Sequence, residues 1–321
     1  MRISREKLLA EAGLTHFRPD VLEKVVHLLG LLETIQSHPF LKGKLALKGG
    51  TALNLFVFNV PRLSVDIDLN YIGAEDKITA LKERTDLEKA LQSVFSREDF
   101  TVQRMPSEHA GGKWLLQYMS STGQMGNLEV DINFMFRIPL WPIIPKDSNP
   151  VGSWQAKNIS VLDIHEIAAG KLAALLSRKQ ARDLFDCRNL FHAACLDIRQ
   201  LRIAFVLYGA MNRKDWRTVS MEDIDFDSDE LARQLTPTLR TTQVKEQKAY
   251  AQTLVNECRQ GLSALLPFDS HEKNFLDLLL DQGKIEPSLL TTDIELQQRI
   301  LRHPLLEWKA QNVRQHKMGS L

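Results

Sequence analysis

The segment 48–69 constrains this chain more than any other stretch of its sequence. It opens with two glycines and a threonine, Gly49, Gly50 and Thr51, which lie between a short apolar run and a helix-like segment. Glycine lets a backbone turn tightly and approach a ligand closely. The amide groups that open the following helix point outward and favour an anion such as phosphate. The sequence therefore predicts a strand, a tight turn and a helix, with a phosphate site at the turn.

The same segment ends in two acidic residues, Asp66 and Asp68, inside a run that is typical of a β-strand. Because side chains alternate along a strand, both carboxylates emerge on one face. Neighbouring carboxylates repel each other unless a cation lies between them, and oxygen ligands of this kind suit Mg²⁺. Either feature alone has a simpler interpretation, as an ordinary turn or a solvated strand. Together, with fourteen residues between Thr51 and Asp66, they resemble the Gly-Gly-[Ser/Thr] … Asp-x-Asp signature of polymerase-β-type nucleotidyltransferases.

A third carboxylate is expected from the stretch 128–136, where apolar and polar residues alternate as in a half-exposed strand. Asp131 stands on the polar face between Glu129 and Asn133. A strand with one solvated face would explain this pattern without any function. A two-metal phosphoryl-transfer site, however, needs one more carboxylate to position or deprotonate the attacking oxygen. We therefore select Asp131 as the third metal ligand, with Glu129 as the alternative.

Composition places the chain among globular proteins. Its 321 residues are 44% hydrophobic and 25% charged, which is typical of a folded chain and not of a disordered one. The formal net charge of +1 provides no global attraction for nucleic acid, so any such contact needs a local patch. The three cysteines lack metal-type spacing, and no apolar run is long enough for a signal peptide or a membrane span. We therefore expect a cytoplasmic protein with reduced thiols and no membrane contact.

The order of the predicted elements indicates an α+β fold of two domains. After the segment 48–69, a helix is expected at 86–95, and a glycine turn at 111–112 is expected to join two strands. Four prolines between residues 139 and 150 then break regular structure, and the pattern beyond them is helical only. We predict a first domain with a small mixed sheet at 1–155 and a helical domain at 156–321 that completes the active-site cleft.

Two helices of the predicted second domain carry charged residues where apolar ones are expected. Lys171 falls in the middle of the apolar stripe of helix 161–178. Its side chain either extends from the edge of the stripe to solvent or points its ammonium group toward a triphosphate. Asp183 and Asp186 lie together beside the buried stripe of the next helix. Basic residues around these helices offer a contact for RNA: Arg178, Lys179, Arg182 and Arg188.

The residues of the first two thirds of the chain also resemble a narrower family, the AbiEii/AbiGii-type nucleotidyltransferase toxins. These proteins are the toxin components of toxin–antitoxin and phage-abortive-infection pairs. The resemblance implies a polymerase-β-like nucleotidyltransferase domain followed by a helical domain. As an ordered set its motifs are specific: Lys48-Gly49-Gly50-Thr51-Ala52-Leu53, Arg62-x-Ser64-x-Asp66-Ile67-Asp68-Leu69, Glu166-x-x-Ala169-x-Lys171-Leu172-x-Ala174, Arg178, and Ala181-Arg182-Asp183-Leu184-x-Asp186.

The resemblance further implies a reaction, partners and a set of site residues. The reaction is Mg²⁺-dependent transfer of a nucleotide from an NTP to an RNA acceptor, which in characterised relatives is a tRNA 3′ end. A cognate antitoxin protein is expected as a partner. Asp66 and Asp68 would hold metal and Lys171 would bind phosphate, while Asp183 or Asp186 would complete the catalytic set. The positions expected to contact the NTP are Lys48, Gly49, Gly50, Thr51, Ser64, Arg178 and Arg182.

Three alternative functions fit the same residues. One is a small-molecule nucleotidyltransferase of the antibiotic-modifying kind, and another is a protein-modifying nucleotidyltransferase. The third is a non-enzymatic nucleotide-binding module, against which the complete set of carboxylates argues. Ser64 matches a position that some relatives have phosphorylated, where a dianion beside Asp66 would repel a triphosphate.

Overall fold

The computed structural model describes residues 3–106, 110–193, 195–243 and 247–318. The chain divides into two compact units. Unit 1 consists of Met1–Arg137, Ile143–Leu162 and Arg233–Lys245, and unit 2 consists of Ile138–Pro142, Asp163–Ala232 and Glu246–Leu321. Each unit therefore includes a short segment that interrupts the other along the sequence.

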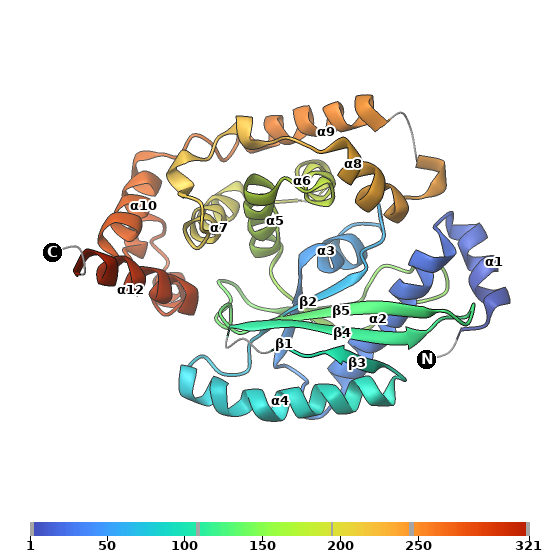
Figure 1. Cartoon of the computed structure of the whole chain (residues 1–321). Coiled ribbons are helices and arrows are strands. Elements are labelled where there is room, and N and C mark those ends of the chain that lie inside the picture. The colour runs from blue at the N-terminus through green and yellow to red at the C-terminus, as the bar shows by residue number, and fades with distance from the viewer. Residues whose placement is uncertain (1–2, 107–109, 194, 244–246, 319–321) are drawn as a thin grey trace. The chain divides into compact units, whose positions relative to one another are not determined.

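The described part of unit 1 is built on a mixed sheet of seven strands in the order β3-β4-β5-β2-β1-β7-β6 (Figure 1). Strands β2 and β5 run parallel, as do β1 and β7, and the other neighbours are antiparallel. This sheet, together with the many helices, confirms the predicted α+β class. The strands are β1 (Leu45–Lys48), β2 (Asp66–Tyr71), β3 (Thr101–Arg104), β4 (Gly111–Met119), β5 (Met125–Asn133), β6 (Ile144–Lys146) and β7 (Ile159–Val161).

The core of unit 1 lies between one face of the sheet and the helices that cover it. Helices α2 and α4 lie on this face, and α3 lies on the other (Figure 1). Phe95 of α4 packs edge-on against Trp114 of β4, with ring centroids 5.4 Å apart, and His27 of α2 lies 4.1 Å from the Tyr118 ring. The helices of unit 1 are α1 (Arg5–Thr15), α2 (Pro19–Ser37), α3 (Gly49–Thr51), which continues as a π-helical turn (Ala52–Val57), and α4 (Lys77–Arg97).

The glycine pair at 111–112 lies inside strand β4, whereas the sequence predicted a turn there. A Cβ at Gly111 would collide with the carbonyl oxygen of Ile132 on the paired strand, and the φ angle of Gly111 is +123°. Both facts exclude any residue with a side chain at this position. The glycines therefore allow β4 to pair closely with β5 along its whole length.

Two further strands, β6 and β7, lie in and just after the proline-containing segment, where the sequence predicted a break in regular structure. With three residues each, they are too short to show the alternation by which a strand is recognised in a sequence. Pro145 is tolerated because β6 is an edge strand of the sheet. Helix α4 also begins before residue 86, because Asp76 caps it by accepting a hydrogen bond from the Thr79 amide at 2.8 Å.

The regular secondary structure among the described residues of unit 2 is all helical. Aspartate side chains cap α5, α7, α10 and α11 at their first turns, which explains why these helices begin where they do. Helix α5 starts later than predicted because Val161 belongs to strand β7. The helices are α5 (Ile164–Arg178), α6 (Ala181–Ala193), α7 (Ile198–Ala210), α8 (Ser228–Glu230), α9 (Gln247–Leu262), α10 (Ser270–Gln282), α11 (Ile294–Leu301) and α12 (Pro304–Met318).

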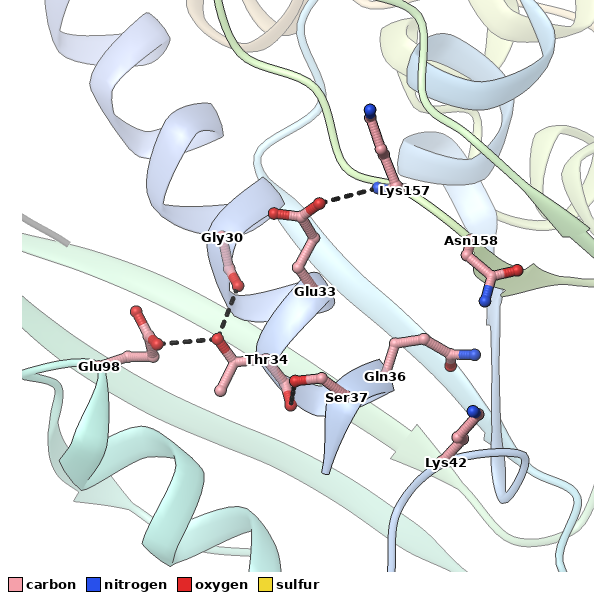
Figure 2. Close-up of a pocket in the computed structure, with 9 residues that line it drawn as sticks. All are labelled: Gly30, Glu33, Thr34, Gln36, Ser37, Lys42, Glu98, Lys157 and Asn158. Atoms are coloured by element: carbon pink, nitrogen blue, oxygen red, sulfur yellow. Dashed lines mark hydrogen bonds between the residues drawn. The ribbon is translucent and has the colours of Figure 1, made fainter. Parts of the chain in front are cut away.

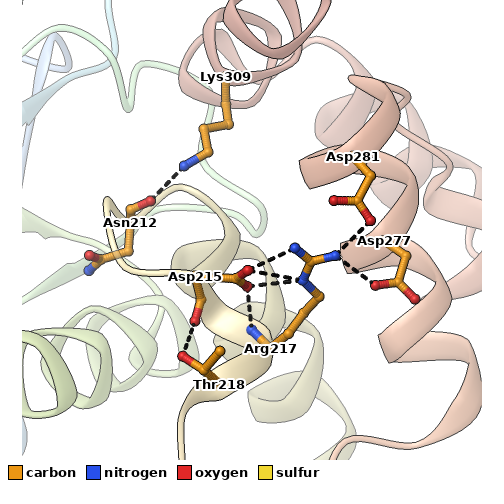
Figure 3. Close-up of polar contacts among 7 residues, drawn as sticks. All are labelled: Asn212, Asp215, Arg217, Thr218, Asp277, Asp281 and Lys309. Atoms are coloured by element: carbon orange, nitrogen blue, oxygen red, sulfur yellow. Dashed lines mark hydrogen bonds and ion pairs between the residues drawn. The ribbon is translucent and has the colours of Figure 1, made fainter. Parts of the chain in front are cut away.

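Charged side chains connect the helices of unit 2. Arg217 lies between three aspartates, with ion pairs of 2.7 Å to Asp215, 3.0 Å to Asp277 and 2.7 Å to Asp281 (Figure 3). Lys309 of α12 donates to a backbone carbonyl, that of Asn212, at 2.8 Å (Figure 3). None of the helices described, in either unit, has the length and apolar character needed to cross a membrane.

Candidate active site

The glycine turn, Gly49–Thr51, follows β1 directly and forms the short helix α3, which continues into the helical segment that the sequence predicted. Gly49 has a φ angle of +73°, and a Cβ on it would collide with the carboxylate of Asp68. Only glycine therefore fits at this position. Thr51 is fully buried, and its hydroxyl donates to the backbone carbonyl of Asp66 at 2.5 Å. The threonine thus fastens the turn to strand β2, and the side chain of Asp68 lies directly against the turn.

Four charged residues form one row across the sheet, on the face opposite to the core. Lys48 of β1 is paired in register with Asp68 of β2, Asp68 with Asp131 of β5, and Asp131 with Lys113 of β4. Side chains of directly paired residues share a face and lie close together, since neighbouring strands are about 4.8 Å apart. We call these four residues the charged row. It has two carboxylates at its centre and one ammonium group at each end.

A second pair of carboxylates lies next to the charged row. Asp66 of β2 is paired in register with Glu129 of β5, two residues along each strand from Asp68 and Asp131. Glu129 forms an ion pair of 2.9 Å with Lys113. The alternation predicted from the sequence is therefore observed, and it places the selected third carboxylate, Asp131, beside Asp68.

The electrostatic environment of Asp131 reflects this crowding. Burial raises the pKa of its carboxyl group, and the negative charges of Asp68 and Glu129 raise it further. The ammonium groups of Lys48 and Lys113 act in the opposite direction. The pKa of Lys113 is raised, mainly by its hydrogen bond to Glu129 and also by Asp131 and Asp66. Asp131 is consequently a better proton acceptor than an ordinary solvated aspartate.

The carboxylates of the charged row suit a magnesium ion in their chemistry. Within the described residues, no three or more His, Cys, Asp or Glu side chains are gathered around one point as metal ligands. Asp66, Asp68 and Asp131 nevertheless face the same side of two adjacent parallel strands. Carboxylate oxygens without nitrogen or sulfur ligands are the donor set that Mg²⁺ prefers. Asp68 and Asp131 are directly paired, and Asp66 lies two residues along the same strand, so the three side chains are neighbours on that face.

Ser64 lies just before strand β2 and is buried, with 5% of its surface exposed. Its neighbour Arg62 is also buried and donates from its guanidinium to the Leu63 carbonyl at 2.8 Å. In this conformation the Ser64 hydroxyl is shielded from solvent. Its expected contact with the NTP stays a prediction.

The predicted residues of unit 2 form a buried ion cluster between α5 and α6. The ammonium group of Lys171 lies 2.9 Å from a carboxylate oxygen of Asp183 and 2.9 Å from one of Asp186. Both aspartates are almost fully buried, and Asp183 also pairs with Arg178 at 2.7 Å. The pKa of Asp183 is lowered, because these cations outweigh the effect of burial. The structure thus brings together Lys171, Asp183, Asp186 and Arg178, while their expected roles in catalysis and NTP binding stay predictions.

The basic residues expected to contact RNA are largely paired with acidic ones. Lys179 lies 3.8 Å from Asp225, and Arg188 forms a close pair with Glu257 at 2.5 Å. Arg178 pairs with Asp183 as described above. Arg182 lies in the first turn of α6 beside these groups. These pairs reduce the positive charge that the sequence suggested for this part of unit 2.

A polar hollow of about 600 Å³ lies elsewhere in unit 1, beside the last turns of α2 and the end of α4 (Figure 2). Its two acidic residues already accept hydrogen bonds: Glu33 from the Lys157 amide at 3.0 Å and Glu98 from the Thr34 hydroxyl at 2.8 Å. No residue of the charged row lines it. The hollow is therefore separate from the candidate active site.

Sequence comparison identifies the family to which these residues belong. The profile of the family described as nucleotidyl transferase AbiEii toxin, Type IV TA system, matches residues 30–269. This match covers well over half of the chain and includes the charged row. The chain belongs to this family. It is a nucleotidyltransferase toxin of a toxin–antitoxin system, so it uses an NTP and has an antitoxin partner.

Comparison of structures agrees with the family assignment at the level of the fold. The chain is similar to MenT4, a nucleotidyltransferase toxin from Mycobacterium tuberculosis H37Rv, with a TM-score of 0.60 and 16% sequence identity. The similarity covers 96% of this chain and 99% of MenT4. A search of curated proteins finds no match. The resemblance inferred from the motifs is thus confirmed for both family and fold.

Sequence reasoning missed one member of the charged row, Lys113. Its position next to Asp131 depends on the pairing of β4 with β5, which the expected glycine turn at 111–112 obscured. Trp114, Leu116 and Tyr118 are spaced two residues apart, but only Gln117 among the residues between and after them is polar, so their spacing gave a weak signal. Continued back by one residue, that spacing would have placed Lys113 on the polar face.

Proposed function

We propose that this toxin transfers a nucleotide from an NTP to the 3′ end of an RNA acceptor, with tRNA as the expected target, in a reaction that depends on Mg²⁺. The observation that carries the proposal is the charged row beside the glycine turn. It combines carboxylates for metal with a backbone turn suited to phosphate in an enzyme of the AbiEii family.

The residues of unit 1 would divide the work as follows. The backbone amides at Gly50 and Thr51 and the ammonium group of Lys48 would bind the triphosphate. Asp66, Asp68 and Asp131 would hold Mg²⁺, which when bound neutralises phosphate charge and activates the acceptor hydroxyl. Asp131 would orient the hydroxyl and take its proton, consistent with its raised pKa. The acceptor oxygen bonds to the α-phosphorus as the bond to the departing pyrophosphate breaks.

In unit 2 we assign the Lys171–Asp183–Asp186 cluster the role of fixing α5 against α6. Lys171 is held by two buried carboxylates, so its charge is balanced within the unit. The role in phosphate binding that the resemblance implies for Lys171 is kept as a proposal. A variant that separates stability from activity tests it below.

The proposal is tested by incubating the purified protein with total RNA, Mg²⁺ and each α-labelled NTP in turn. RNA should become labelled, and periodate oxidation of the RNA should abolish labelling because it destroys the 3′-terminal diol. Omission of Mg²⁺ or the substitution Asp68→Asn should have the same effect. Label that enters a small molecule or a protein, and never RNA, would contradict the proposed acceptor. Undiminished labelling in EDTA would contradict the metal.

A further inference from the structure

Lys113 occupies the end of the charged row that lies farthest from the glycine turn. Its strand, β4, pairs with β5, which in turn pairs with β2, and β1 with the turn follows on the far side of β2. The side chain of Lys113 is 60% exposed, and that of its partner Glu129 is 41% exposed. An ammonium group is thus available to solvent next to Asp131.

Stability does not explain the presence of this lysine. Lys113 and Glu129 form a diagonal pair across two antiparallel strands, and both are largely solvated. Exposed pairs of this kind contribute little to stability, because solvent screens them and ordering the long side chains costs entropy. The pair is therefore easily exchanged for another anionic partner of the lysine.

The order of the charged residues along the sheet indicates which anion Lys113 binds during the reaction. Given the proposed function, the triphosphate lies at the β1 end of the row and the attacking hydroxyl lies at Asp131. In an in-line displacement the attacking oxygen approaches from the side opposite to the leaving group. The acceptor molecule must then extend from Asp131 toward β4, where Lys113 is the cation of the row.

We propose that Lys113 binds a phosphate of the acceptor chain beside the attacking hydroxyl, and so selects a polynucleotide over an uncharged or cationic acceptor. A polynucleotide has a phosphate next to its terminal nucleoside. With the terminal hydroxyl at Asp131 of β5, that phosphate would lie toward Lys113 on the adjacent β-strand, β4. A cationic small molecule of the antibiotic type would be repelled by the same ammonium group. This inference rests on the proposed function and adds an acceptor subsite to it.

The test compares Lys113→Gln with the control Lys89→Gln. Lys89 is an exposed residue of α4, the helix that covers the opposite face of the sheet, and it lies 3.9 Å from Asp86. The control therefore makes the same change of charge away from the charged row. Lys113→Gln should raise the KM for RNA about tenfold and leave the KM for the NTP within twofold. The slope of log(kcat/KM) for RNA against log salt should become shallower by about one. Lys113→Arg should restore most of the lost affinity, and the control should match wild type.

A second comparison uses small acceptors. A dinucleoside monophosphate carries the phosphate in question, and a nucleoside lacks it. Lys113→Gln should weaken transfer to the dinucleoside monophosphate about tenfold more than transfer to the nucleoside, because its effect on the neighbouring Asp131 is common to both acceptors. Equal effects on both would overturn the inference, as would an unchanged KM for RNA or a raised KM for the NTP.

If wild type itself labels no RNA, the proposed function fails; if it labels RNA and Lys113→Gln behaves like Lys89→Gln, only the acceptor subsite fails. A thermal melt of each variant identifies any loss of fold, for which Lys113→Arg serves as the conservative replacement.

Discussion

The two units place charges in contrasting ways. In the charged row of unit 1, Asp68 and Asp131 lie side by side on adjacent strands and remain half-buried. In unit 2 each buried aspartate of the cluster contacts a cation, and both Asp183 and Asp186 lie 2.9 Å from Lys171. Arg217, between three aspartates, repeats the second arrangement nearer the surface (Figure 3).

The proposed function assigns the charges of the first kind to the reaction and those of the second kind to the stability of the fold. A buried carboxylate next to a cation is satisfied, and removal of the cation leaves an uncompensated charge that destabilises the protein. Adjacent carboxylates repel each other, which the flanking Lys48 and Lys113 oppose, and in the proposed function a bound metal ion relieves the rest of this repulsion. Substitutions in the two units should therefore have opposite consequences.

The largest effect is expected from Asp68→Asn in the charged row. Loss of one of the paired carboxylates should reduce nucleotide transfer on the order of 10³-fold, because charge in the transition state is no longer neutralised. Thermal stability without Mg²⁺ should hold or rise, since repulsion with Asp131 is relieved. Transfer assays and thermal melts check both results. Asp86→Asn on α4 is the control and should change neither; full activity of Asp68→Asn would refute the metal assignment.

The converse is expected for Lys171→Met in unit 2. Without the ammonium group, Asp183 and Asp186 lose a buried partner, and the free energy of unfolding should fall by about 3 kcal/mol. Urea denaturation measures this, with the exposed Lys89→Met as a control that should cost less than about 1 kcal/mol.

The double variant Lys171→Met/Asp186→Asn sharpens the interpretation of Lys171. It removes one of the stranded charges and should recover part of the lost stability. If it is stable but inactive, while Asp186→Asn alone is active, the proposed phosphate role of Lys171 gains support. If Lys171→Met alone is as stable as wild type, the structural role of the cluster is wrong.

A smaller, pH-dependent effect is expected at Glu166, a buried carboxylate without a cation among its hydrogen-bond donors. It accepts from the amides of Leu140 and Trp141 and from the Tyr208 hydroxyl at 3.0–3.3 Å. Burial raises its pKa from 4.5 to about 7. The folded state therefore binds more protons than the unfolded state between these values, and stability falls as pH rises from about 4.5 to 7.

Glu166→Gln should remove this dependence. The difference in unfolding free energy between wild type and variant should change by up to about 3 kcal/mol across that window, and should be constant above it. Denaturation curves at a series of pH values measure the difference. Glu295→Gln, on the surface of α11, serves as the control. A pH-independent difference for Glu166→Gln would mean that the pKa of this carboxyl group is the same in the folded and unfolded states.

The sequence by itself determined the features that depend on short spacing. Gly49, Thr51 and the Asp66–Asp68 pair follow from local rules, since a turn needs glycine and strand alternation places both carboxylates on one face. The same alternation correctly put Asp131 on a polar face. The ordered motifs were also sufficient to identify the AbiEii family, which the profile match confirms.

The tertiary structure decided what depends on contacts between distant segments. Strand register brought Lys113 beside Asp131 and Asp68, and no local pattern specifies which strands become neighbours. Helix packing placed both Asp183 and Asp186 at 2.9 Å from Lys171, whereas the sequence showed a lysine in one apolar stripe and two aspartates on the next helix. Strands β6 and β7 exist because the sheet supplies their hydrogen-bond partners, which three residues cannot signal alone. In each case the deciding interaction joins segments far apart in the chain, so its energy appears only once the chain has folded.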